Sequence, residues 1–335
     1  MNPIKTTSFL LALAFIFSFC EDPFFEDDPT NNPITNFEIL WNRMNERYSF
    51  FEYKNVDWDS VYQVYRPQVN NEMTAQELFD VMEAMLNTLR DAHVNLRSDF
   101  DISFYDYYNE APRNFYFHDI EKNYLGQTLR ITGRMWNGII DSIGYIHYPS
   151  FQLPIEEDEL DYLVDRFRNL KGLIIDIRDN EGGDPLYGFR LARRIATKRT
   201  HIYTSIYKNG PGIDDFTAPS EAYLDTNDKK KFNLQVVLLT NRVTYSAGNF
   251  FTAMMMALPD VTVIGDTTGG GGGVPLGWEL PNGWHFNYSN SITWMPDGFI
   301  IEDGIPPDIQ LNITDEHRLE GQDTILEAAL DLLGR

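Results

Sequence analysis

Ser246 is the residue whose type and setting most directly suggest chemistry. It follows an apolar run at residues 236–239 that reads as a buried strand, and it precedes residues 250–258, which read as a helix. A hydroxyl at such a turn suits a nucleophile, because the helix N-terminus supplies free backbone N–H groups and a partial positive charge. Those groups favour an oxyanion that develops beside the serine. If Ser246 is a nucleophile, the protein is a hydrolase, and a general base must lie elsewhere in the chain.

Six histidines are available as that base, and one of them differs in its setting. His93 follows a predicted helix end and stands beside Asp91 in the run DAHVNLRSD. The others are His118, His147, His201, His285 and His317. On the sequence alone, a structural or surface role stays open for all six. The chain has no HExxH or CxxC spacing, so we expect no metal site.

Two glycine clusters and one carboxylate complete the candidates. Gly182 and Gly183 follow the apolar run GLIIDIR, where they could supply an oxyanion N–H or form a plain tight turn. The glycines at 269–273 lack the lysine of a phosphate-binding loop, so we expect a flexible loop on the substrate side of the nucleophile. Glu302 is expected on a strand before a Gly-Ile-Pro-Pro turn. It could orient a histidine, as the acid of a triad does, or be an exposed strand-end acid.

The elements that must position these residues read as a helical part followed by an α/β part. Helices are predicted from Thr35, over residues 58–65 and after Thr74, and the pairs Thr35/Glu38 and Thr74/Glu77 both match a capping box. From residue 143, apolar strands alternate with helices. That alternation predicts an α/β fold whose sheet is covered by helices on both faces.

The net charge and the N-terminal residues indicate where the protein is located and which partners it excludes. The 335 residues carry a net charge of −23, which argues against nucleic acid and anionic membrane surfaces as partners. An apolar run at residues 9–19 follows Lys5 and is too short to span a bilayer, which predicts a signal peptide. Cys20, the only cysteine, closes this run and predicts lipidation after signal cleavage, although Phe19 stands where a small residue is expected. A plain cleaved signal and an uncleaved anchor are the alternatives.

Several runs occur together in a recognisable order: DAHV, GYIHYPSF, GLIIDIRDNEGG, YSAGNFFTAMM, VIGDTTGG and IEDGIPPD. As a set they resemble the C-terminal processing peptidase family of serine peptidases, in particular its branch related to the tricorn core and to interphotoreceptor retinoid-binding protein. The resemblance implies a ClpP/crotonase-like α/β core, with a sheet flanked by helices and an N-terminal helical subdomain. It also implies a polypeptide substrate and no cofactor.

Carried over residue by residue, the resemblance implies a Ser-His-Glu site. It gives Ser246 as nucleophile, His93 as base, Glu302 as the acid that orients the base, and oxyanion donors at Ala247 and at Gly182 or Gly183. One branch of the family uses a lysine in the loop after the serine, but residues 267–271 contain none, which excludes the Ser-Lys mechanism. Some tricorn-like members place a catalytic serine before the histidine, where this chain has Ala92.

The expected organisation has five segments: a signal peptide at 1–20, an acidic flexible linker at 21–34, a helical subdomain at 35–98, an intermediate segment without a recognisable PDZ module at 99–142, and a catalytic domain at 143–335. The leading hypothesis is a serine endopeptidase of the bacterial cell envelope, in contact with the membrane only through a lipid anchor. The alternative is a non-catalytic binder of apolar ligands or peptides on the same fold. A third reading, a component of a nutrient-uptake system, rests on the anchor alone.

Overall fold

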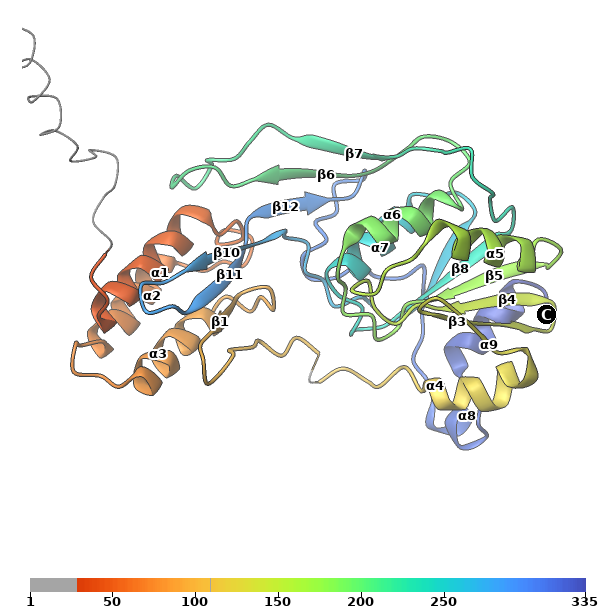
Figure 1. The fold of residues 1–335 in the computed structure, drawn as a ribbon, viewed down its shortest axis with the longest axis horizontal. Helices are drawn as coiled ribbons and strands as arrows, with labels where there is room; N and C mark the ends of the chain where they lie inside the picture. The colour runs from red at the N-terminus through yellow and green to blue at the C-terminus, as the bar shows by residue number, and fades with distance from the viewer. Residues whose placement is uncertain (1–28, 109) are drawn as a thin grey trace, which may run out of the picture.

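The computed structural model describes residues 29–108 and 110–335. The predicted signal peptide, Cys20 and most of the predicted linker lie outside the described residues. Figure 1 shows a helical part near the N-terminus and, beside it along the long axis, an α/β part that holds the large sheet. No helix among the described residues is both long and apolar enough to cross a membrane.

The helical part begins with three amphipathic helices: α1 (Pro33–Arg47), α2 (Trp58–Tyr65) and α3 (Ala75–Asn87), with the short turn η1 (Arg66–Gln68) after α2. The predicted start of the first helix at Thr35 is wrong, because Asn32 is the N-cap and accepts the Thr35 N–H at 2.9 Å. The capping box of Thr74 and Glu77 is confirmed at the start of α3. Helix α2 has the predicted bounds, and the side chain of Asp57 caps it.

A small antiparallel sheet completes the helical part. Its order is β1-β11-β10, with β1 (Asn95–Arg97), β11 (His285–Ser289) and β10 (Pro275–Glu279). Side chains of β11 and its loop, including Trp284 and Phe286, lie in one buried cluster with those of α1 and α3. The helical part therefore includes chain that comes far later in the sequence. The predicted segment boundaries at residues 98 and 142 stay predictions.

The large sheet has seven strands in the order β13-β9-β8-β5-β4-β3-β2. Their bounds are β2 (Arg130–Thr132), β3 (Met135–Ile140), β4 (Ile143–His147), β5 (Gly172–Asp176), β8 (Gln235–Thr240), β9 (Val261–Gly265) and β13 (Ile309–Gln310). Strands β4, β5, β8, β9 and β13 are parallel, and β3 and β2 extend one edge in antiparallel pairing. The carboxyl ends of the parallel strands thus share one edge of the sheet, where α/β proteins build their sites.

Helices cover both faces of this sheet, as Figure 1 shows. One face carries α5 (Glu157–Phe167), α6 (Pro185–Arg193) and α7 (Ala247–Met256), and the other carries α4 (Phe117–Ile120), the turns η2 (Glu121–Leu125) and η3 (Gly126–Thr128), α8 (Asp315–Leu319) and α9 (Thr324–Leu332). Along β5, Leu173 and Ile175 belong to the cluster on the first face, and Ile174 belongs to the cluster on the second. This alternation explains why the strand is apolar throughout. The predicted α/β class is confirmed.

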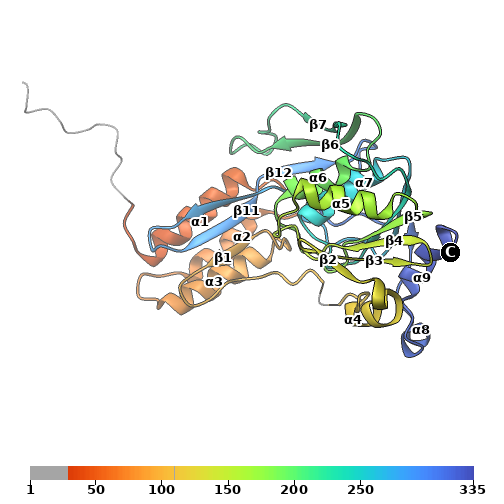
Figure 2. The same ribbon diagram turned by 45° about the vertical axis from the view of Figure 1, so that its right-hand side comes forward.

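A further sheet and a long connecting segment also join the parts. A third antiparallel sheet has the order β12-β6-β7, with β12 (Ser291–Trp294), β6 (Thr200–Tyr207) and β7 (Ser220–Leu224). It extends above both parts in Figure 1. The chain from residue 98 to α4 runs along the opposite side, from the helical part to the α/β part (Figures 1 and 2). The candidate site lies where the two parts meet.

Candidate active site

Ser246 stands at the turn between β8 and α7, directly before the first helical residue, Ala247. Its backbone has φ 53° and ψ −118°, a combination that costs a residue with a side chain about 1–3 kcal/mol. The strained turn is held by hydrogen bonds of the serine and of the residue before it. Its N–H donates to Gly270 O at 2.9 Å, and the preceding Tyr245 N–H donates to Asn180 O at 3.0 Å. A sharp turn of this kind directs the hydroxyl away from the helix it precedes.

His93 meets the serine from the helical part. Its Nε2 lies 2.9 Å from Ser246 Oγ, although the two residues are 153 positions apart in the chain. The backbone leads to it through Arg90 in a left-handed conformation, φ 50°. The His93 N–H donates to Asp91 Oδ1 at 2.8 Å, and the imidazole packs against the ring of Tyr245 at a centroid distance of 4.9 Å. The structure therefore brings the predicted nucleophile and the predicted base to hydrogen-bond distance.

The protonation of His93 suits a base. Burial lowers the pKa of the imidazole below its usual 6.5, and the charge of Asp91 and the backbone of Gly273 oppose this shift. The neutral form, which can accept a proton at Nε2, is therefore favoured at neutral pH. Nδ1 is buried, and within residues 29–108 and 110–335 no group meets it with hydrogen-bond geometry.

Glu302 lies in a turn and not on the predicted strand, so that expectation is wrong. The residue is buried, with 4% of its surface exposed. One carboxylate oxygen accepts the Gly272 N–H at 2.9 Å, and the other lies 2.9 Å from Lys54 Nζ. Burial, reinforced by the charge of Asp91, raises the pKa of Glu302 to about 8, while Lys54 opposes the shift. Among the described residues, the carboxylate makes no hydrogen bond to His93.

The predicted oxyanion donors lie beside the nucleophile. Gly182 has φ 100°, and a Cβ built on it would stand 2.8 Å from both Ser246 Cβ and Ala247 N. Its own N–H is already bonded to Asn180 Oδ1 at 2.9 Å. Across the described ranges, the N–H groups of Gly183 and Ala247 are used in no internal hydrogen bond. Of the predicted set, Gly183 and Ala247 are thus the two with a free donor, and α7 adds its dipole.

The loop of consecutive glycines is packed between Ser246 and Glu302. Residues 268–273 are all buried. Gly269 N donates to Thr244 O at 2.7 Å, and Gly271 N donates to Glu302 O at 2.9 Å. A side chain on Gly270 would clash with the backbone of Glu302. The expectation of a flexible loop is wrong, because the glycines allow close backbone contact here.

An aromatic cleft opens at the serine and has a volume of about 350 Å³. It is lined by Ala92, His93, Phe104, Tyr107, Tyr108, Gln152, Glu181, Gly183, Tyr245, Ser246 and Pro275. Tyr107 comes from the connection between the two parts and stacks on Tyr245 at 4.3 Å. No functional residue was predicted in this connection, although its many Tyr and Phe side chains were an available signal.

The remaining histidine in the α/β core has a structural role. His147 is buried, its Nδ1 lies 3.1 Å from Asp176 O, and its ring stacks with Phe117 and Trp136. Burial lowers the pKa of His147 to about 4, so it stays neutral. In the part of the chain that the structure describes, no three His, Cys, Asp or Glu side chains are grouped to hold a metal ion.

A serine on a strained strand-to-helix turn, a neutral histidine at its hydroxyl and free N–H groups beside it define a serine-hydrolase type of site on an α/β fold. Comparison with known families agrees with this class. The model of peptidase family S41 matches residues 142–311, and the model of the tricorn protease C1 domain matches residues 29–87. The first match covers about half of the chain. The chain belongs to peptidase family S41, a family of serine peptidases, which confirms the resemblance predicted from the sequence.

Individual relatives extend this result. The crystal structure of a candidate peptidase from Parabacteroides merdae is 44% identical, has a TM-score of 0.86 and covers 91% of this chain and 98% of that one. The carboxy-terminal processing protease CtpA of Bacillus subtilis is 27% identical over 182 residues, 53% of this chain and 37% of that protein. The tricorn protease of Thermoplasma volcanium is 27% identical over 218 residues, 64% of this chain and 19% of that protein. The match thus spans well under half the length of these two curated relatives.

A more distant structure shares only the fold. Mature CPAF, solved in complex with lactacystin, has a TM-score of 0.70 at 12% identity and covers 90% of this chain and 98% of that one. The predicted fold class, a central sheet flanked by helices with an N-terminal helical part, is confirmed by these likenesses.

Proposed function

We propose that this chain is a serine endopeptidase that hydrolyses polypeptides through an acyl-enzyme. The observation that carries the proposal is the 2.9 Å separation between His93 Nε2 and Ser246 Oγ, which spans the two parts of the molecule. A histidine in the neutral form at that distance can take the hydroxyl proton as the oxygen attacks a carbonyl carbon. Membership of peptidase family S41 supports the same reaction.

The proposed steps use Ser246, His93 and the two N–H donors beside the serine. Ser246 Oγ attacks the scissile carbonyl while its proton passes to His93 Nε2. The N–H groups of Ala247 and Gly183 stabilise the tetrahedral oxyanion, and each such donor is worth about 10²–10³ in rate. His93 then gives the proton to the leaving amine. Water, activated by the same histidine, hydrolyses the acyl-enzyme and regenerates the serine.

We propose Glu302 as the acid that stabilises the imidazolium by its charge. Its burial and its bond to the glycine loop that also holds Ser246 support this role. A buried carboxylate close to a forming cation stabilises it far more than it would in water. The bonds of Glu302 to Lys54 and Gly272 keep the group in that place.

The test is the variant Ser246→Ala, assayed on an unfolded protein and on a library of fluorogenic peptides. We expect kcat/KM to fall by about 10⁴ or more, because removing a nucleophile disables the unit as a whole. The kcat/KM of His93→Ala should fall by a similar factor. The matched control is Ser220→Ala, an exposed serine on β7, which should keep full activity.

The unfolding temperatures of all three variants must match that of the parent protein. Undiminished cleavage by Ser246→Ala would refute the proposal. A parent protein that binds peptides without cleaving them would instead support the alternative, a non-catalytic binder on the same fold.

A further inference from the structure

Lys54 lies buried between the segments that carry the proposed base and acid, although no motif singled it out. It stands on the loop between α1 and α2, and 6% of its side chain is exposed. Its Nζ is 2.9 Å from Glu302 Oε1 and 3.6 Å from Asp303 Oδ1. It also donates to the backbone carbonyl of Arg90 at 3.2 Å. A buried lysine without such partners would carry a large desolvation cost.

The same lysine is tied to the segment that leads to His93. The Arg90 guanidinium donates to Lys54 O at 2.9 Å, so the two residues are bonded in both directions. Arg90 has the strained φ of 50° that turns the chain toward Asp91 and His93. Asp91 in turn accepts the His93 N–H. Lys54 therefore links the base-bearing segment to Glu302 through direct contacts.

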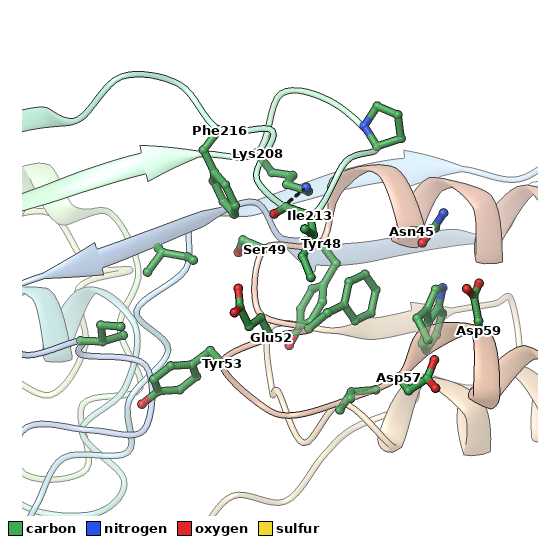
Figure 3. Close-up of a pocket in the computed structure, with 16 residues that line it drawn as sticks. Asn45, Tyr48, Ser49, Glu52, Tyr53, Asp57, Asp59, Lys208, Ile213 and Phe216 are labelled. Atoms are coloured by element: carbon green, nitrogen blue, oxygen red, sulfur yellow. Dashed lines mark hydrogen bonds between the residues drawn. The ribbon is translucent and has the colours of Figure 1, made fainter.

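The loop of Lys54 borders a cavity on its other face. Tyr48, Glu52 and Tyr53 line a cavity of about 510 Å³, across which lie Lys208 and Phe216 from the chain around β6 (Figure 3). At the start of this loop, Ser49 bonds to the carbonyls of Ser289 and Ser291. Tyr48 and Phe50 of this loop also belong to the buried cluster of the helical part. The bonds of Lys54 to Arg90 and Glu302 add the contacts that join the loop to the segments of the site.

We propose that Lys54 is a positioning residue, which holds the Glu302 carboxylate beside the catalytic histidine segment and balances the two buried negative charges there. This inference rests on the proposed function. Burial lowers the pKa of Lys54, but the charges of Glu302, Asp91 and Asp303 outweigh burial, so the pKa is raised and the lysine is charged. The group that Lys54 stabilises is therefore the ionised form of Glu302.

Removal of the lysine should change the pH dependence as well as the rate. The charged groups that act on the Glu302 carboxyl are Lys54, Asp91 and Asp303, with Tyr48, Tyr53 and Tyr245 around them. Arg90 and Arg242 line the same cavity as Glu302. Lys54 is the cation in this set that lowers the pKa of Glu302. Without it, the carboxyl group stays protonated to higher pH, because burial and Asp91 remain. The neutral acid supplies no charge to the imidazolium.

The experiment compares Lys54→Met and Lys54→Arg with the parent protein. It also compares the double variant Lys54→Met/Glu302→Gln with Glu302→Gln alone. For each protein, kcat and KM are measured from about pH 5 to about pH 10. We expect Lys54→Met to lose about 10²-fold in kcat at neutral pH, with KM nearly unchanged, and to regain activity as pH rises. Lys54→Arg should stay within about tenfold of the parent, since it keeps the charge. The double variant should equal Glu302→Gln, because the lysine acts through that carboxylate.

Unfolding temperatures separate this effect from loss of the fold. If Lys54→Met does not fold, the double variant, which removes the unpaired carboxylate, still provides the comparison with Glu302→Gln. A pH profile of Lys54→Met that matches the parent, or a further loss of more than about tenfold in the double variant, would overturn the inference. Failure of the proposed function looks different: the parent protein would then be inactive, or Ser246→Ala would be active.

Discussion

Single residues at this site are selected by backbone shape as much as by side-chain chemistry. Ser246 is held at φ 53° by its bond to Gly270, and Gly182 fits against Ser246 only because it has no Cβ. Gly270 likewise permits the close contact with the backbone of Glu302. The glycine pair and the glycine run are thus steric requirements of a site where three loops meet. A strained serine positioned by such loops is preorganised for attack.

The pH dependence of the parent enzyme should report Glu302 first. Burial and Asp91 raise the pKa of Glu302 to about 8, and in the proposed mechanism its ionised form is the one that stabilises the imidazolium. Activity should therefore rise as pH increases through about 8. In Glu302→Gln the rise in activity near pH 8 should disappear. A rise at lower pH should remain, because burial holds the pKa of His93 below 6.5. We expect kcat/KM of Glu302→Gln to be about 10²–10⁴ lower than that of the parent.

A profile of kcat/KM against pH for both proteins provides the measurement, and Glu316→Gln, at an exposed acid on α8, is the control that should keep the parent profile. If activity rises over the same pH range in the parent and in Glu302→Gln, the assignment of this rise to Glu302 is contradicted. Because Glu302, Lys54 and Asp91 interact, the observed values belong to the group as a whole.

Ser246 and His93 were predictable, and Lys54 was not, for a physical reason. Ser246 carries a local signal, since a strand, a turn and a helix surround it in sequence. His93 became identifiable through the resemblance of DAHV to a family motif. Lys54 pairs with a carboxylate at the far end of the chain, and an ion pair of that span leaves no periodicity or motif at either end. Two further features were hidden for the same reason: that His93 Nδ1 has no hydrogen-bond partner within residues 29–108 and 110–335, and that Glu302 is bonded to Lys54 and Gly272.

Among the elements, β5 and α9 are joined by a buried ionic cluster behind the site. Arg178, just after β5, is fully buried, with its guanidinium 2.6 Å from Asp176 Oδ2 and 2.8 Å from Asp323 Oδ2. It also donates to Asn114 O at 3.1 Å. Asp323 is the N-cap of α9 and accepts the N–H groups of Ile325 and Leu326. One side chain thus fixes a strand end, a helix start and the connection between the two parts.

Arg178→Met should therefore destabilise the fold strongly. It leaves two buried carboxylates without their cation, and breaking a buried pair from one side costs about 3–5 kcal/mol. The matched control is Arg199→Met, which removes an exposed pair with Asp225 whose side chains are 61% and 60% exposed. That change should cost about 0–1 kcal/mol. The measurement is the free energy of unfolding in urea.

Equal losses in Arg178→Met and Arg199→Met would show that the buried cluster does not hold β5 and α9 together. A second comparison uses the double variant Arg178→Met/Asp323→Asn, which removes one of the two carboxylates left without a cation. It separates the effect of losing the arginine from the cost of an unpaired buried carboxylate. Its stability should lie between that of Arg178→Met and that of the parent protein.

Element prediction succeeded where local signals were complete. Helix α2 was predicted with its observed bounds, because its start follows a capping Asp57 and its end precedes Pro67. The strand predicted from the apolar run at residues 236–239 likewise lies within β8 (Gln235–Thr240). The pairing of β1 with β11 was missed, because it joins segments that are far apart in sequence and short. Glu302 was misplaced on a strand, since an apolar run before a turn reads alike in a strand and in a buried loop.

At the scale of the whole molecule, the site exists only when both parts are present. The helical part supplies His93 and Lys54, and the α/β part supplies Ser246 with its oxyanion donors. The chain from β10 to β12 ties the parts together, because its strands pair with β1 on one side and with β6 on the other. In the proposed mechanism the helical part is therefore a component of the catalytic unit and not an appended module. The order of the segments in the sequence did not reveal this arrangement, because β10 and β11 of the helical part come late in the chain.

The final prediction concerns where the molecule works. Cys20, which lies outside the described residues, follows an apolar run typical of a signal peptide, and we propose that it carries a lipid anchor in a bacterial cell envelope. Each buried CH₂ of an acyl chain contributes about 0.8 kcal/mol to membrane binding, so lipidation should hold the protein in the membrane fraction. Cys20→Ala should incorporate no labelled palmitate and should move to the soluble fraction, with its peptidase activity retained.

Ser246→Ala is the matched control, because it should lose hydrolysis and still incorporate palmitate at Cys20. The fractionation also distinguishes the alternatives at the N-terminus. A Cys20→Ala protein that stays in the membrane with its N-terminal residues uncleaved would show that the apolar run at residues 9–19 is itself the anchor. A parent protein that is cleaved and soluble would show a plain signal peptide. Either result would contradict the lipid anchor and leave the catalytic proposal intact, since the residues that carry the chemistry all lie after the linker.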